Sequence, residues 1–179
     1  MALDMTGVKL YEVGEEIAEI LNDIDDFQDD RKKLFGQKVN YRYTPPRVTT
    51  EGRVVIGFAR PEDIAPAQFP CAFIWNGEGD KTGDSKEMSE YSECDGFVIV
   101  YFHEAKAEEA YKKLLLIERI VDKAINLKRR WNDPLVTIRT SGISVAPNLL
   151  SKFGDDVPLK PPFYGARVDY KINIARANL

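Results

Sequence analysis

Apolar residues recur at spacings of three and four in two stretches of the chain, and this period predicts two amphipathic helices. The first helix is expected from about Glu12 to Phe27 and the second from about Ala105 to Trp131. The residues predicted to face the core are Val13, Ile17, Ile20, Leu21, Ile24 and Phe27 in the first helix, and Tyr111, Leu114, Leu115, Ile117, Val121, Ala124 and Ile125 in the second. Acidic residues in the opening turns, and Lys128 to Arg130 near the end of the second helix, suit the helix macrodipole.

Four other stretches have the composition or the alternation of β-strands. Pro70–Trp75 and Phe97–His103 are rich in β-branched and aromatic residues, so we predict that they pair across a long polar hairpin tip at residues 76–95. Leu135–Ala146 predicts one strand with a glycine break, or two short strands. Phe163–Ala177 alternates with a period of two, which predicts a half-solvated strand. Its predicted buried face is Tyr164, Ala166, Val168, Tyr170, Ile172 and Ile174, and its predicted solvent face is Arg167, Asp169, Lys171 and Asn173.

Residues 31–70 differ from the rest of the chain because they have few long apolar runs. The prolines of this segment are Pro45, Pro46, Pro61, Pro66 and Pro70. Within it, Arg47–Ala59 predicts two short strands about a turn at Glu51–Gly52. A connection of this length is typical of functional arms or binding loops, so we predict an irregular basic arm.

The order of these elements predicts an α+β fold, with a mostly antiparallel sheet, two helices packed on one face, a long β-hairpin and an extended arm. A chain of 179 residues fits a single domain over residues 1–179. No run approaches the ~18 apolar residues of a membrane span, and the first residues are unlike a signal peptide. With only two cysteines, we expect a protein that folds in a reducing cytoplasm away from membranes.

The formal net charge of −4 hides two adjacent blocks of opposite sign. Glu12–Asp30 carries nine acidic residues and no basic one, whereas Arg31–Arg60 carries eight basic residues and a single acid, Glu51. One interpretation is a solvated helix face followed by a basic loop, and the other is a pair of complementary surfaces that contact another copy or a partner. Basic residues interleaved with Tyr41 and Tyr43 also suit a phosphate backbone, but the acidic total favours protein contact.

The polar hairpin tip contains glycines and carboxylates, which raises the alternatives of a phosphate loop and a calcium loop. The stretch GEGDKTGDS lacks the G-x-x-x-x-G-K-[ST] spacing, and a strand rather than a helix follows it. Counted from Asp80, the ligand positions of an EF-hand fall on unsuitable residues. A loose cation site made by Asp80, Asp84 and Glu87 stays open. We favour a solvated tip that contacts a partner.

Residues suited to catalysis are sparse. His103 is the only histidine and has no second histidine with which to share a metal, so a core or helix-capping role is expected. Cys71 is expected to be a small buried hydrophobe, and the acidic neighbours of Cys94 would raise the pKa of its thiol. No nucleophile elbow is present. We therefore expect no enzymatic activity, no catalytic or metal-binding residues and no cofactor.

The residues that carry a family resemblance are spread from Glu12 to the end of the chain. They comprise the acidic first helix, a strand preceded by FP, a polar hairpin, FVIVYF, a long helix with LLLIERIVDKAINL, a strand near GISVA and the closing VDYKINI. This organisation resembles the tail terminator and tail completion proteins of long-tailed bacteriophages, which are minor tail proteins of the tail-to-head joining type. The resemblance is one of pattern and order.

The resemblance implies a structural virion protein, located in the tail or neck and assembled in the host cytoplasm. Such a subunit forms a homo-oligomeric ring, usually a hexamer, that caps the tail tube and meets the head connector, with DNA passing through the ring. A ring of this kind needs two different complementary faces on each subunit. The residues expected to contribute are Glu15 and Glu19 on the acidic helix, Arg42, Arg47 and Arg53 on the basic arm, and Asp80, Asp84 and Glu87 on the hairpin tip. The alternative is a head-tail connector or neck adaptor that contacts DNA through the basic arm.

Overall fold

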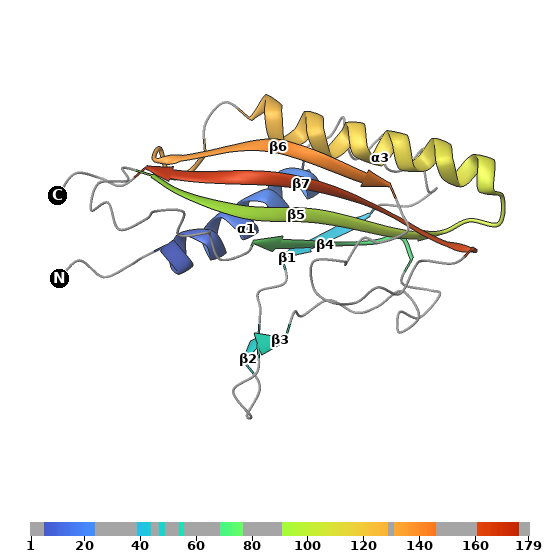
Figure 1. Ribbon diagram of the computed structural model, residues 1–179, viewed down its shortest axis with the longest axis horizontal. Helices are drawn as coiled ribbons and strands as arrows, with labels where there is room; N and C mark the ends of the chain where they lie inside the picture. Colours follow the sequence, from blue (N-terminus) through green and yellow to red (C-terminus); the bar gives the residue numbers. More distant parts are fainter. Residues whose placement is uncertain are drawn as a thin grey trace.

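A computed structural model describes residues 6–23, 39–43, 47–48, 54–55, 69–76, 91–128, 131–145 and 161–175. The elements in chain order are α1 (Thr6–Asp23), β1 (Asn40–Tyr43), β2 (Arg47–Val48), β3 (Val54–Val55), β4 (Cys71–Asn76), β5 (Tyr91–His103), α3 (Ala107–Leu127), β6 (Val136–Val145) and β7 (Phe163–Ala175). Five of the strands form one sheet with the order β1-β4-β5-β7-β6, which Figure 1 shows face on. Every neighbouring pair is antiparallel except β1 and β4, which are parallel.

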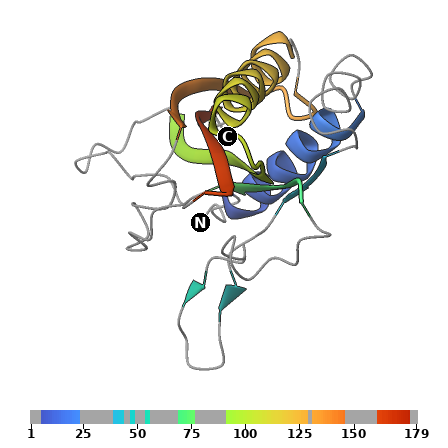
Figure 2. The ribbon, with the colours of Figure 1, turned by 90° about the vertical axis from the view of Figure 1, so that its right-hand side faces the viewer.

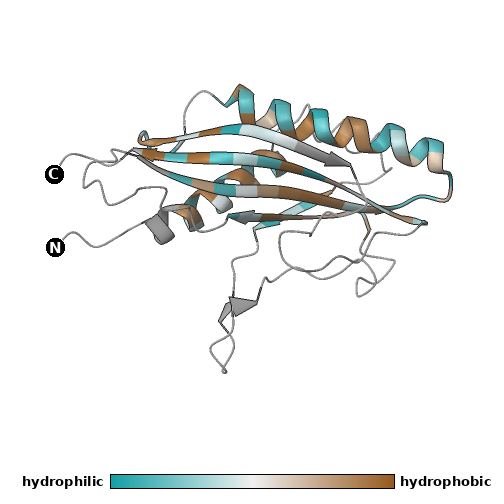
Figure 3. Ribbon diagram, viewed as in Figure 1, coloured by the Kyte–Doolittle hydropathy of each residue, from teal (hydrophilic) through white to brown (hydrophobic). Residues whose placement is uncertain are grey.

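Both helices lie on the same side of this sheet, as Figure 2 shows end on. One continuous core joins the inner faces of α1 and α3 to strand residues such as Ile74, Val98 and Val168. Strand β7 owes this packing to its alternation of apolar and polar residues, which Figure 3 displays as alternating colours, whereas the second half of β5 is apolar on both faces. The predicted α+β class, with a mostly antiparallel sheet and two helices on one face, is therefore confirmed.

The opposite face of the sheet carries a second apolar cluster around Phe97, Ile99 and Tyr101, all of which are at most 1% exposed. The ring of Trp75 stacks on Phe97 at 5.1 Å between centroids. The guanidinium group of Arg167 lies over the same ring at 4.3 Å. Arg167 is only 4% exposed, so its expected place on a solvent face is wrong. The aromatic ring and the ion pair with Asp169, at 2.6 Å, replace water around its charge.

The helices differ from the expected ones at their ends and flanks. Helix α1 starts at Thr6 rather than Glu12, because the apolar spacing continues back to Leu10, which is buried. Helix α3 ends at Leu127, and Lys128 is its extended C-cap. Tyr111 and Leu115 were predicted to face the core, but they are 58% and 43% exposed. The true stripe is narrower and is made by Ala110, Leu114, Ile117, Ile120, Val121, Ala124 and Ile125.

The predicted pairing of Pro70–Trp75 with Phe97–His103 is confirmed by the antiparallel ladder of β4 and β5. The expected bounds of the hairpin tip, 76–95, are wrong at both ends. Asn76 closes β4 opposite Gly96, and residues 91–95 belong to β5, where they pair with β7. Within this ladder Lys171 of β7 pairs with Glu93 and Asp95 at 3.2 and 2.6 Å, and Cys94 between them is buried in the core.

Residues 31–70 contain more regular structure than an irregular arm. The two short strands expected about the Glu51–Gly52 turn are confirmed as β2 and β3, which pair antiparallel and lie apart from the main sheet in Figures 1 and 2. Strand β1 was not expected, and it extends the main sheet by parallel pairing with β4. Of the two alternatives for residues 135–146, a single strand is correct. Strand β6 is continuous, with a bulge between Thr140 and Gly142.

Candidate functional site

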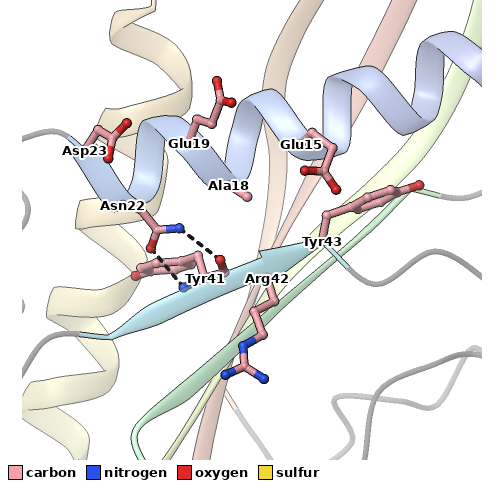
Figure 4. Close-up of a pocket in the computed structure, with 8 residues that line it drawn as sticks. All are labelled: Glu15, Ala18, Glu19, Asn22, Asp23, Tyr41, Arg42 and Tyr43. Carbon is pink, nitrogen blue, oxygen red and sulfur yellow. Dashed lines mark hydrogen bonds between the residues drawn. The ribbon is translucent and has the colours of Figure 1, made fainter.

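An open groove of about 440 Å³ lies between α1 and β1, at one edge of the sheet. Figure 4 shows its eight lining residues, which come from the last turns of the helix and from the strand. The lining residues are Glu15, Ala18, Glu19, Asn22, Asp23, Tyr41, Arg42 and Tyr43. The lining therefore includes three carboxylates and two phenolic side chains, whereas the cationic side chain of Arg42 extends away from the helix.

Helix periodicity sets the acidic side of this groove. Val13, Ile17 and Leu21 are buried against the sheet, which leaves the opposite helix face to solvent. Glu15, Glu19 and Asp23 share that face at spacings of four residues, and all three are exposed. Like charges at this spacing destabilise a helix by a few tenths of a kcal/mol each, so this acidic row is not explained by helix stability. The three carboxylates give this side of the groove a negative electrostatic potential.

Strand alternation sets the other side. Tyr41 and Tyr43 of β1 lie toward α1, whereas Arg42 extends away from the helix, as Figure 4 shows. Gly14 lets the ring of Tyr43 come close, because a Cβ at this position would overlap the ring. Tyr11 meets the same ring edge to face at 5.3 Å. Burial raises the pKa of Tyr43 to about 12, with smaller electrostatic contributions from the neighbouring Tyr11 and Glu15.

The side chain of Asn22 closes the floor of the groove. Its amide nitrogen donates to the carbonyl of Tyr41 at 3.0 Å, and its oxygen accepts from the backbone nitrogen of Tyr41 at 3.0 Å. Both bonds are drawn in Figure 4. These two hydrogen bonds fix the end of α1 to the outer edge of the sheet. They therefore hold the two sides of the groove in place relative to each other.

The structure brings together only some of the residues expected at interaction sites. Glu15, Glu19 and Arg42 are all lining residues of the groove, although the side chain of Arg42 extends away from α1. Arg47 lies in β2, and its side chain is outside the described part of the structure. The remaining candidates, Arg53, Asp80, Asp84 and Glu87, lie outside the described residues.

Sequence reasoning did not identify Asn22, and it considered Tyr41 and Tyr43 only for contact with a phosphate backbone, not as residues that face the acidic helix. A signal for β1 was present, because Val39, Tyr41 and Tyr43 alternate with two polar residues. The prolines and the few long apolar runs of residues 31–70 predict an arm instead, and an alternation over five residues is too short to outweigh them. The role of Asn22 has no sequence signal, since it depends on how the helix meets the strand.

The described residues offer little chemistry beyond binding. Burial raises the pKa of the Cys71 thiol to about 11, against an opposing effect of Arg42, so this sulfur is protonated near neutral pH. His103 is exposed at the end of β5, where its ring meets Phe163 edge to face, so the expected core role is wrong. At the start of α3 the side chain of Glu104, and not His103, accepts a hydrogen bond from the backbone nitrogen of the N-cap residue Lys106 at 3.3 Å. No cluster of three metal-ligating side chains occurs within the described ranges. The groove suits the binding of cationic groups by its carboxylates.

No protein-family model matches the sequence, and no curated protein matches it. Among solved structures, the bacteriophage SPP1 gp17 protein is similar over 98% of this chain and 94% of that chain, with 14% sequence identity and a TM-score of 0.36. A TM-score of this size establishes neither a shared fold nor a shared function. Neither α1 nor α3, the two helices in the described part of the chain, is long and apolar enough to cross a membrane.

Proposed function

We propose that the protein is a structural subunit of a bacteriophage tail, a tail terminator whose copies form a ring. The ring caps the tail tube and joins it to the head connector. The observation that carries this proposal is the exposed acidic row of Glu15, Glu19 and Asp23 beside an open groove. It supplies one defined contact face on an α+β subunit whose order of elements resembles the tail terminator proteins.

A ring with rotational symmetry is made by a heterologous contact, so each subunit needs a second, different face that complements the first. The segment from Arg31 to Arg60 fits this requirement by charge, with eight basic residues against one acidic residue. Opposite charges on two faces steer copies into register and suppress wrong contacts. In this arrangement the acidic row of one copy receives basic residues, including Arg47 and Arg53, of the next, and six copies close the ring.

The carboxylates of residues 76–95 have a role in the same proposal. Asp80, Asp84 and Glu87 lie between two strands of the sheet in sequence, and they give this segment a negative charge. Facing the lumen or the tube end, they would repel the DNA backbone and let the genome pass. Reversal of these three charges is expected to impair tail joining, and intact joining would exclude this role.

A charge-reversal experiment tests the ring itself. Glu15→Lys/Glu19→Lys adds positive charge to the acidic row, and Glu108→Lys/Glu109→Lys makes the same net change on the exposed start of α3. Electron microscopy and sedimentation of the purified variants, alone and with tail tubes, are the measurements. We expect rings from the wild type and the α3 variant and none from the α1 variant. Rings from all three proteins, or loss of rings in both variants alike, would contradict the acidic row as the contact.

A neck adaptor that contacts DNA is the second candidate. Arg42 favours it, because its exposed side chain extends away from the acidic helix. Basic residues that contact phosphates release counterions, so binding would weaken steeply with salt. A shift of generic DNA at low salt that is reduced in Arg42→Ala would support this function. The absence of a shift at low salt would exclude it.

A further inference from the structure

An asparagine side chain from a helix contacts each outer strand of the sheet. The outer strands are β1 and β6, because the order of the sheet is β1-β4-β5-β7-β6. An outer strand presents unpaired backbone groups that can pair with a strand of another chain. The two contacts therefore occur where uncontrolled pairing between copies would begin.

At β1, the Asn22 amide takes the place of a neighbouring strand. Backbone groups of alternate residues point to the two sides of a strand, so those of Arg42 face β4 while those of Tyr41 face outward. The Asn22 side chain satisfies both outward groups of Tyr41, each at 3.0 Å. This donor and acceptor pair is the one that an added strand would need. Tyr41 occupies the middle of the short outward edge between Val39 and Tyr43.

At β6, the equivalent residue is Asn126 of α3. Its amide nitrogen donates to Thr140 Oγ1 at 2.9 Å, and its oxygen lies 3.5 Å from the backbone nitrogen of Thr140. A further bond to Asp122, at 2.8 Å, holds the amide in place. The backbone contact is longer than at β1, but Thr140 also begins the bulge that ends at Gly142. Bulges bend an edge away from regular pairing.

We propose that the side chains of Asn22 and Asn126 prevent strand pairing between copies at the two edges of the sheet, because they occupy outward-facing backbone groups. Because one outward backbone position of each outer strand is occupied by an asparagine, copies of this chain meet through side-chain surfaces and not by extension of the sheet. The exposed charges of Arg42 on β1 and Arg139 on β6 also oppose strand pairing, as charged residues on edge strands commonly do. The inference rests on the hydrogen bonds of the sheet edges and is independent of the tail function.

The test compares Asn22→Ala, Asn126→Ala and the double variant with the wild type. Asn40→Ala is the matched control, because Asn40 is an exposed asparagine of β1 whose backbone groups face β4. Sedimentation over a range of concentrations measures association, and infrared amide bands report intermolecular strands. All proteins in this test carry Glu15→Lys/Glu19→Lys, which removes ring formation through the acidic row. The outcome for the sheet edges is therefore separate from the outcome for the proposed ring contact.

We expect each single variant to dimerise through one opened edge, since two identical edges pair by a two-fold axis. The double variant should form longer chains, because its two different edges can also pair head to tail. Dissociation constants should fall at least about tenfold relative to Asn40→Ala, with a new intermolecular strand band. Folded variants that associate no more than Asn40→Ala would overturn the proposal. If Asn22→Ala does not fold, Asn126→Ala decides alone, because Asn126 is exposed and its loss does not threaten the core.

Discussion

The hydroxyl group of Tyr170 in β7 donates a hydrogen bond to the side-chain oxygen of Asn76 at the end of β4. The amide nitrogen of Asn76 donates in turn to the carbonyl of Leu10 in α1, at 2.7 Å. Gly96 of the intervening strand leaves room for the tyrosine, because a Cβ there would overlap its ring. Two strands and a helix are thus joined through the core by one polar chain, whose tyrosine and asparagine are 1% and 3% exposed.

Tyr170→Phe tests the strength of this connection. The change removes the hydroxyl group and takes its hydrogen bond from the buried oxygen of Asn76, which costs about 1–3 kcal/mol when no other donor replaces it. Burial raises the pKa of Tyr170 well above its ordinary value, so the hydroxyl keeps its proton at neutral pH. We expect urea unfolding at neutral pH to show a free energy of unfolding lower by about this amount.

Tyr111→Phe is the control for this measurement, because Tyr111 lies on the surface of α3 and is 58% exposed. Removal of the Tyr111 hydroxyl group should change the free energy of unfolding by no more than about 0.5 kcal/mol. Similar losses in the two variants would show that the bond to Asn76 contributes nothing particular to stability.

Gly14→Ala is expected to destabilise the protein, against the usual preference of helices for alanine. Alanine inside a helix is favoured over glycine by about 1 kcal/mol. Here the new methyl group would overlap the ring of Tyr43, and overpacking of this kind costs about 1–3 kcal/mol. Thermal and urea unfolding should therefore show a net loss.

A double-mutant cycle with Tyr43→Ala separates the two effects. Once the ring is gone, Gly14→Ala should become neutral or stabilising by up to about 1 kcal/mol. A loss that persists in the Tyr43→Ala background would place its cause elsewhere in the helix.

The fold was predictable where a period was long enough to be recognised. The alternation that ends at Ile174 and the stripe that contains Val121 each extend over more than ten residues. The period placed most of their apolar residues on the core side, with Tyr111 and Leu115 as exceptions at the flank of the helix stripe. Strand β1 was missed because four residues give too short a period, and its partner β4 lies about thirty residues further on.

The candidate site was less predictable, because it depends on tertiary contacts. The acidic face with Glu15 and Glu19 could be read from helical spacing alone. The two hydrogen bonds between the Asn22 side chain and the Tyr41 backbone could not be predicted, since they arise only where the helix meets the sheet edge. Burial of Arg167 was unexpected for the same reason, because alternation predicts a polar face but not the aromatic ring that covers it.

Lys128→Met is predicted to cost more than Glu16→Gln. The Glu16 carboxylate is 7% exposed and is paired with Lys128, and it also accepts a bond from the backbone nitrogen of Asn132 at 2.9 Å. Loss of the lysine leaves a buried charge with too few partners, which we expect to cost about 2–4 kcal/mol because the lysine itself is partly exposed. Glutamine keeps an acceptor for Asn132 and carries no charge, so its cost should be smaller.

The double variant completes this test. In Lys128→Met/Glu16→Gln no unpaired charge remains, so the loss in free energy of unfolding should be smaller than the sum of the two single losses. Additive losses would mean that the lysine acts through its contact with the ring of Trp131, at 4.8 Å, and not through the ion pair.

Alkaline pH should destabilise the protein in part through Tyr43. Burial raises the pKa of this phenol from about 10 to about 12, so the folded state favours the protonated form. The corresponding stability is complete below the unfolded pKa near 10, and it is lost as the pH rises toward 12. Tyr43→Phe removes this group and should make stability fall less steeply above about pH 10, as measured by urea unfolding across the alkaline range. An unchanged slope in Tyr43→Phe would show that the burial of this phenol is not linked to unfolding.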